Sequence, residues 1–119
     1  MDDQQLSSIT RLPLVALRGR VVLPNASEPL FVGRERSVAS VQNALKSNKL
    51  ILCVAQRDDK TDEPQIAELY ERATIVEIVN FNAVPDGSIR ILAKGVAIVN
   101  LNEVSEEDDI QWGSFDHSW

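Results

Sequence analysis

The sequence predicts a single α+β domain that is mainly β and has one main α-helix. Three observations lead to this prediction: two long strand-like runs flank a turn at residues 85–87, a short apolar run occupies residues 50–56, and one helical stripe follows Gly33. With 119 residues, 44% of them hydrophobic and 25% charged, the chain has the size and composition of an ordinary globular domain. Such a chain needs no disulfide or metal to hold its core.

The amino-terminal part is predicted to form a polar tail and then short extended segments. Residues 1–10 are polar, and we expect a flexible tail. Residues 11–18 alternate as in a strand, and Pro13 suits the edge of a sheet because proline donates no ladder hydrogen bond. Residues 21–24 and 28–32 are two further extended runs, each with a proline.

One helix is predicted from about residue 34 to residue 47. Val38, Val41 and Leu45 recur at helical spacing and form an apolar stripe. Asn48 follows as a residue that tolerates left-handed backbone at a helix end. We expect the charged run at residues 34–36 to be the solvated corner between a strand and this helix. An anion-binding site at the helix amino terminus is the alternative.

The middle and the end of the chain give further expectations. Residues 50–56 are a continuous apolar run of strand length and predict a central strand. Residues 57–64 predict a charged loop, and residues 65–71 one or two helical turns. Residues 105–109 predict an acidic loop, and residues 110–119 a last strand or a tail.

Residues 73–101 show the clearest pattern, a long hairpin around Pro85-Asp86-Gly87. Proline presets the first turn position, and Gly87 supplies the left-handed conformation that a three-residue loop requires. Pairing Val84 with Ser88 fixes the register and predicts one core face, which consists of Ile75, Val79, Phe81, Ala83, Ile89, Ile91, Ala93 and Ala97. In this register Phe81 lies opposite Ile91, and Val79 lies opposite Ala93.

No constellation of residues predicts an active site. The chain has no glycine-rich phosphate-binding motif, and one histidine (His117) and one cysteine (Cys53) are too few for a transition-metal site. The acidic residues 106–109 lack the ligand spacing of a calcium loop. Cys53 lies in an apolar run, which favours a buried small side chain over a reactive thiol. We therefore expect no catalytic residue, no cofactor and no metal.

The distribution of charge limits the possible partners. Residues 1–57 carry eight Lys or Arg and four Asp or Glu, whereas residues 58–119 carry four and fourteen. The net charge of −6 disfavours nucleic acid, because phosphate neutralisation supplies most non-specific affinity. The first ten residues do not resemble a signal peptide, and no apolar stretch is long enough to span a bilayer. We expect a cytoplasmic protein that binds neither nucleic acid nor membrane.

Several short stretches occur in a recognisable order. They are LPL at residues 12–14, PLFVGRE at 29–35, VAQRD at 54–58, DEP at 62–64, LY at 69–70 before AT at 73–74, and PDGSIRIL at 85–92, followed by Gly95. Their order and spacing resemble the amino-terminal domain of the ATP-dependent Lon protease family, the LON substrate-binding domain. The resemblance covers roughly residues 11–95 and fades beyond about residue 101. The chain departs from the family pattern at residues 25–27, where a methionine is usual, and at Ala73, where a glycine is usual.

The resemblance implies a PUA-like, β-barrel-like lobe with one main helix and no catalytic activity of its own. Its implied role is recognition of unfolded, damaged or tagged proteins for an ATP-dependent serine endopeptidase. Residues 11–119 would form the β-rich lobe alone, without the family's helical second half, ATPase or protease segments. The implied partners are protein substrates and, within a full protease, its ATPase and protease domains and neighbouring subunits. The alternative is a free-standing binding module or adaptor with no protease of its own.

A domain that binds unfolded chains is expected to expose apolar side chains, because unfolding exposes apolar segments. Leu23 and Pro24 end a short extended run, and Val84 and Pro85 lie at the predicted hairpin tip. None of these four residues is directed to a core by the patterns. We expect them to form the candidate protein-binding surface; scattered surface hydrophobic residues are the alternative.

Overall fold

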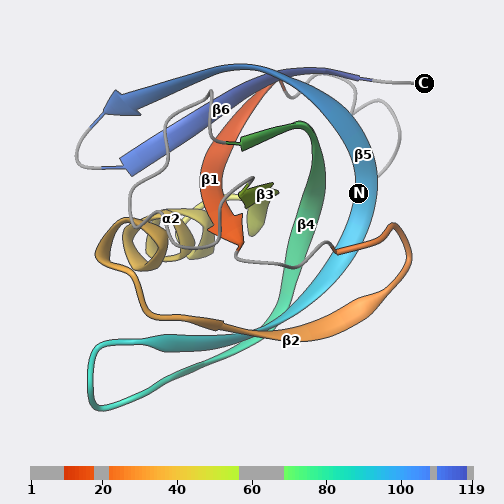
Figure 1. The fold of residues 1–119 in the computed structure, drawn as a ribbon. Coiled ribbons are helices and arrows are strands. Elements are labelled where there is room, and N and C mark those ends of the chain that lie inside the picture. Colours follow the sequence, from red (N-terminus) through yellow and green to blue (C-terminus); the bar gives the residue numbers. More distant parts are fainter. Residues whose placement is uncertain (1–9, 18–21, 57–68, 108–109, 118–119) are drawn as a thin grey trace.

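The computed structural model describes residues 10–17, 22–56, 69–107 and 110–117, and it shows a mainly β fold (Figure 1). The elements in chain order are β1 (Arg11–Leu17), β2 (Ser27–Val32), α2 (Glu35–Leu45), β3 (Leu50–Gln56), β4 (Leu69–Ala83), β5 (Ile89–Glu107) and β6 (Ile110–His117). Helix α2 is the one helix of the described residues. The predicted α+β, mainly β fold class is confirmed.

The six described strands form one mixed sheet that nearly closes into a barrel. The strand order is β2-β5-β4-β3-β1-β6, and β6 also pairs with β5. Strands β5, β4, β3, β1 and β6 therefore form a ring, and β2 lies beside β5 outside this ring (Figure 1). Only β1 and β3 run parallel among these pairs. The β-barrel-like lobe and the central position of β3 are as predicted.

Strand β5 joins the two parts of the barrel because it changes partners along its length. Residues 89–94 pair with β2, and residues 99–107 pair with β6. Between these two ladders Gly95 contacts the segment that precedes β2. The Gly95 carbonyl accepts a 2.9 Å hydrogen bond from the Asn25 N–H, and the Gly95 N–H donates a 2.9 Å hydrogen bond to the Ala26 carbonyl.

Two apolar clusters fill the interior. The first contains side chains of α2, β2 and the first half of β5; its buried members are Val15, Val22, Leu30, Val32, Val41, Ala44, Ile51, Cys53, Val76, Ile78, Ile89, Ile91 and Ala93. The second lies among β1, β3, β4 and the β5–β6 pair; its buried members are Leu12, Leu14, Leu50, Leu52, Val54, Ala73, Ile75, Val99, Leu101 and Phe115. Removal of this apolar surface from water is the main stabilising term of the fold.

Helix α2 begins one residue later and ends two residues earlier than predicted. Its apolar stripe faces inward: Val41 is fully buried, and Val38 packs against the first cluster. The buried hydroxyl of Ser40 donates a 2.9 Å hydrogen bond to the carbonyl of Leu14, which fixes the helix against β1. The left-handed residue after the helix is Lys49, with a φ of 62°, so the prediction of Asn48 is wrong.

The hairpin between β4 and β5 turns at residues 85–87, as predicted. The Val84 N–H donates to the Ser88 carbonyl at 2.9 Å, and Gly87 has a φ of 96°. The hydroxyl and the N–H of Ser88 donate to the Asp86 carboxylate at 2.6 and 2.9 Å. These hydrogen bonds stabilise the ionised carboxylate and lower the pKa of Asp86.

The predicted hairpin register holds at both ends and shifts in the middle. Phe81 lies opposite Ile91, as predicted. Irregularities after Ile75 and after Ile78 displace the residues between them by one position, so Ala93 pairs with Ile78. The predicted pairing of Ala93 with Val79 is therefore wrong. A β-bulge inserts an unpaired residue into one strand in this way.

Part of the predicted core face is exposed. Phe81 and Val79 are 52% and 53% exposed, and Ala83 is exposed as well, although Ile91 on the neighbouring strand is buried. The reason is that β3 pairs with β4 only as far as Glu77. Beyond that point β4 has a described neighbour on one side only, and the core covers β5 but not the end of β4.

Other predictions of element type also change. Residues 69–71 belong to β4 rather than to a helical turn, and residues 105–107 belong to β5 rather than to a loop. Residues 110–117 form a last strand, one of the two predicted forms. The predicted loop at 57–64 and residues 1–9 of the predicted tail lie outside the described residues.

Strand β1 is not at the edge of the sheet, because it lies between β3 and β6. Pro13 is nevertheless placed where a missing N–H costs little. It lies opposite Trp112 of β6, and pairing with β3 begins only at the next residue, Leu14.

Candidate functional site

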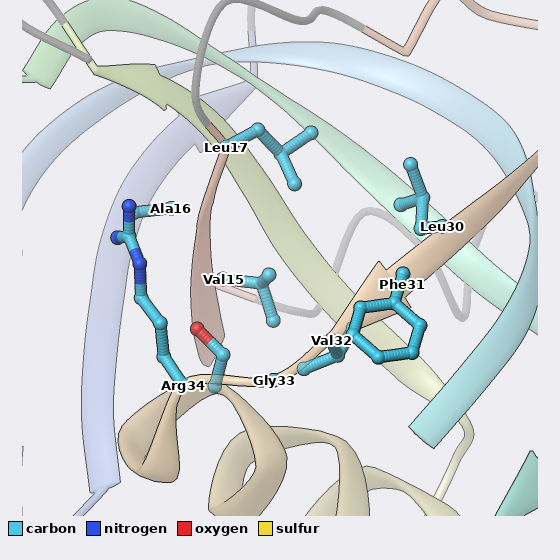
Figure 2. A pocket seen from close by; sticks show the side chains of 9 residues that line it. Val15, Ala16, Leu17, Leu30, Phe31, Val32, Gly33 and Arg34 are labelled. Atoms are coloured by element: carbon cyan, nitrogen blue, oxygen red, sulfur yellow. The ribbon is translucent and has the colours of Figure 1, made fainter. Parts of the chain in front are cut away.

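A groove of about 260 Å³ opens between the end of β1 and the end of β2 (Figure 2). The β1 residues lie on one side and the β2 residues on the other, with Gly33 and Arg34 at one end. The nine lining residues are Val15, Ala16, Leu17, Leu30, Phe31, Val32, Gly33, Arg34 and Ser37.

Two strand edges form the walls of the groove. Strand β1 pairs with β6 at residues 11–13 and with β3 at residues 14–17. Beyond residue 13, the edge of β1 that faces away from β3 therefore has no described strand beside it. Strand β2 pairs with β5, and its other edge also has no partner among the described strands. Strand β6 closes the barrel at one end; at the other end no described strand lies between β1 and β2, and α2 is hydrogen-bonded to β1 through Ser40.

Polar and apolar atoms contribute similar shares of the groove lining, and one lining side chain is cationic. Three of the residues that line the groove are buried members of the first core cluster, namely Val15, Leu30 and Val32. Phe31 is 61% exposed at the rim. Arg34 is the one charged residue among the nine that line the groove.

The charged corner at residues 34–36 is only partly the solvated turn that the sequence predicts. It does connect β2 to α2, as predicted, and Glu35 is exposed. Arg34 and Arg36, however, are half-buried. Arg36 Nη1 lies 3.1 Å from Glu106 Oε2, so this arginine links α2 to β5.

The structure separates the four residues predicted to form a binding surface. Leu23 is 58% exposed and Pro24 is half-buried beside Gly95. Val84 is half-buried and Pro85 is exposed at the hairpin tip. The two pairs lie at opposite ends of the ladder between β2 and β5, about 20 Å apart at the usual rise of about 3.3 Å per residue. None of the four lines the groove.

Four other large apolar residues are exposed that the sequence did not predict to be exposed: Phe31, Val79, Phe81 and Leu92. A signal for Phe31 existed, because it alternates with the apolar residues Leu30 and Val32. The period of two in a strand directs Phe31 to the face opposite its neighbours. No such signal existed for the pair on β4, because a bulge and the end of the β3 ladder determine their exposure.

A match to the family of ATP-dependent protease La (LON) substrate-binding domains covers residues 11–117. The chain belongs to this family. The match extends through β6, so the sequence resemblance to the LON domain reaches further than the expected residues 11–95.

Curated relatives of this LON domain are much longer proteins. The chain is 38% identical over 97 residues to the Lon protease of Vibrio parahaemolyticus, covering 82% of this chain and 12% of that protein. It is 34% identical over 107 residues to the Lon protease of Escherichia coli K12, covering 90% of this chain and 14% of that protein. The chain therefore spans about an eighth of the length of the relatives that it matches.

Solved structures of LON domains share the fold. The N-terminal domain of Mycobacterium avium complex Lon protease superposes with a TM-score of 0.72 at 14% identity, covering 92% of this chain and 55% of that one. The Lon N-terminal domain protein from Xanthomonas campestris gives a TM-score of 0.68 at 21% identity, covering 92% and 60%. At these identities the likeness concerns the fold alone.

Metal-ligating groups and the cysteine thiol can be assessed in the described part of the LON domain. No group of three or more His, Cys, Asp or Glu side chains gathers there in a way that could hold a metal ion. Cys53 is buried, and burial raises the pKa of its thiol to about 12, so it is protonated and a poor nucleophile at neutral pH. None of the helices in this part is long and apolar enough to cross a membrane.

Proposed function

We propose that this LON domain binds unfolded, damaged or tagged protein segments and catalyses no reaction itself. The observation that carries the proposal is the family match over residues 11–117, because the family is described as a substrate-binding domain. The structure supports it with large apolar side chains that are exposed, at Leu23, Phe31, Val79, Phe81 and Leu92. Unfolded segments expose apolar groups, and the free energy falls when such surfaces cover these groups and remove them from water.

The proposal is restricted to the LON domain, because each observation above was made on this domain alone. It applies to a free-standing LON module or adaptor in the cytoplasm, the alternative that the sequence raised. It applies equally to a domain joined to ATPase and serine-protease domains, to which it would deliver bound segments within an assembly of subunits. A reading frame that continues toward a nucleotide-binding motif would favour the joined form.

Binding to an unfolded protein tests the proposal directly. A reduced and carboxymethylated protein, which cannot refold, is labelled with a fluorophore and titrated with the purified domain while anisotropy is recorded. Its folded, disulfide-bonded form is the matched control. We expect weak binding of the unfolded form, with a Kd on the order of 10⁻⁵ to 10⁻³ M, since a few side chains offset little of the ordering entropy.

Two results would contradict the proposal. If the domain binds both forms with equal affinity, or binds neither form, it does not recognise unfolded segments. Hydrolysis of ATP or of peptides by the purified chain would show that the chain is catalytic.

A further inference from the structure

We infer that the outer face of strands β2, β5 and β4 binds short protein segments in which carboxylates flank an apolar side chain. The inference rests on the proposed function and adds the place of binding and the class of segment. It starts from an exposed apolar patch that lies beside two cations, in a chain whose net charge is −6.

The register of three adjacent strands defines this outer face. Strand β5 lies between β2 and β4 (Figure 1). The side chains of residues 89–94 alternate between buried and exposed, so every second one points away from the core. Exposed residues of β2 and β4 lie opposite these exposed residues of β5. The outer face therefore contains Pro29, Phe31, Asn80, Arg90, Leu92 and Lys94.

An apolar patch lies at the centre of the outer face. Phe31 and Leu92 are 61% and 37% exposed, and Pro29 is exposed directly opposite Leu92. Phe31 pairs with Arg90, so Phe31 and Leu92 are diagonal neighbours. Such neighbours are typically about 7–8 Å apart, within reach of an aromatic ring. One apolar side chain of a bound segment can therefore contact both residues and remove their exposed surface from water.

Cations lie on both sides of Leu92 along β5. Arg90 and Lys94 are each two residues from Leu92, about 6.6 Å away at about 3.3 Å per residue. Both cross-strand neighbours of Arg90 are uncharged, and no described carboxylate forms an ion pair with Arg90. Glu77, opposite Lys94, is the one carboxylate paired with these three residues of β5. Two cations and one carboxylate give the outer face a positive charge, opposite in sign to that of the whole chain.

This arrangement favours a segment with the complementary order of side chains, a carboxylate, an apolar group and a carboxylate at alternate positions. Alternate side chains of an extended segment point to one side, about 6.6 Å apart, which is also the spacing of Arg90, Leu92 and Lys94. A guanidinium binds a carboxylate through charge-assisted hydrogen bonds. An exposed ion pair alone contributes little to affinity, so the apolar contact must accompany it.

Size and charge distinguish this occupant from a folded partner and from a nucleic acid. Three strands about 4.8 Å apart span about 10 Å, and residues 90–94 of β5 span about 13 Å. A stable interface with a folded partner, including a second copy of the chain, needs about 800 Å² on each side. The outer face is much smaller than this, and it suits a short segment. Two cations also neutralise too few phosphates to hold a nucleic acid well.

Three peptides and the ¹⁵N-labelled protein test the inference. The parent peptide is acetylated and amidated Glu-Ser-Phe-Ser-Glu. The second, Gln-Ser-Phe-Ser-Gln, lacks the carboxylates, and the third, Glu-Ser-Ser-Ser-Glu, lacks the apolar side chain. We expect the parent to bind weakly and to shift the amide signals of residues 29–31 and 90–94. The other two peptides should bind several-fold more weakly.

Two protein variants separate the charge from the apolar contact, and both positions are exposed, so the variants should fold. Arg90→Gln should weaken binding of the parent about two- to fivefold, the range for an exposed charge pair, and should leave binding of the second peptide unchanged. This loss should shrink at high salt, which screens exposed charges. Arg72→Gln is the matched control, because Arg72 is exposed on β4 opposite Asn100, outside the outer face. Phe31→Ser should weaken binding of the parent by roughly fivefold or more, because aromatic anchors dominate small interfaces.

Several outcomes would overturn the inference. Equal binding of the first two peptides, or equal losses in Arg72→Gln and Arg90→Gln, would exclude recognition of a carboxylate at this face. Shifts confined to residues around Leu23, Phe81 or Val84 would place the site elsewhere. Competition between the parent and a single-stranded oligothymidylate would indicate a nucleic-acid site. Concentration-dependent shifts at the outer face without peptide would indicate a second copy of the chain.

The carboxymethylated protein used to test the proposed function distinguishes the two failures. If it binds Phe31→Ser and Arg90→Gln as tightly as it binds the native domain, the outer face is not its site and the proposed function stands. If it binds no form of the domain, the proposed function fails.

Discussion

Replacement of Gly95 by alanine should break the contact between β5 and the segment that leads into β2. A Cβ at this position would overlap with the carbonyl oxygen of Leu23, and it would lie 2.7 Å from the carbonyl carbon of Leu23 and 3.2 Å from Cα of Pro24. All three are backbone atoms, so no side-chain rotation relieves the clash. Either the segment or β5 must move.

The size of the effect follows from what this movement removes. The two 2.9 Å backbone hydrogen bonds of Gly95 would be lost, at about 0.5–1.5 kcal/mol each. Val22, which is 1% exposed, would lose much of its burial, worth about 1.5–3 kcal/mol. The Thr74 hydroxyl, which donates to the Val22 carbonyl at 2.8 Å, would lose its acceptor as well. We expect the free energy of unfolding to fall by roughly 2.5–6 kcal/mol.

Urea unfolding followed by circular dichroism measures this difference. Gly33→Ala is the control, because a Cβ there contacts only the Phe31 side chain, at 3.4 Å, and Gly33 is exposed. The control should lose less than about 1 kcal/mol. If Gly95→Ala unfolds at the same urea concentration as Gly33→Ala with an unchanged slope, the close approach at Gly95 does not constrain the fold and the reasoning fails.

Four further changes have defined outcomes. Gly87→Val should cost about 1 kcal/mol or more, because φ is 96° there, and an unchanged urea midpoint would contradict the left-handed turn. Phe81→Ala should cost less than about 2 kcal/mol because the ring is half-exposed, and a loss of 3–5 kcal/mol would show that it belongs to the core. Ser40→Ala should cost about 1–3 kcal/mol in the same melt, because the buried Leu14 carbonyl loses its donor; a neutral result would mean that water replaces the hydroxyl. Cys53 should resist alkylation by iodoacetamide at pH 8 until urea unfolds the chain, since burial raises its pKa to about 12; rapid native labelling would contradict that burial.

The parts of the fold that local sequence signals determine could be predicted. The turn at residues 85–87 fixes the register near it, because proline and glycine restrict the backbone at defined positions. The apolar stripe of α2 and the continuous run of β3 likewise follow from periodicity within a short window. Each of these features needs only residues that are neighbours in the chain.

The features that the sequence missed depend on where distant strands begin and end. Phe81 has the alternation of a core residue, and it is exposed because the β3 ladder ends at Glu77. Residues 105–107 (Ser-Glu-Glu) have the composition of a loop, and they are strand because β6 pairs with them. Pairing between segments far apart in sequence overrides local propensity in both cases.

The groove between β1 and β2 was beyond prediction for the same reason. Its existence requires that β6 leave β1 after residue 13, that β2 pair with β5 instead of β1, and that the ends of β1 and β2 lie on either side of it. No local pattern encodes any of these three facts. The four residues predicted to form a binding surface, Leu23, Pro24, Val84 and Pro85, lie at two separate places, because the β2–β5 ladder lies between the two pairs and no local pattern encodes that ladder.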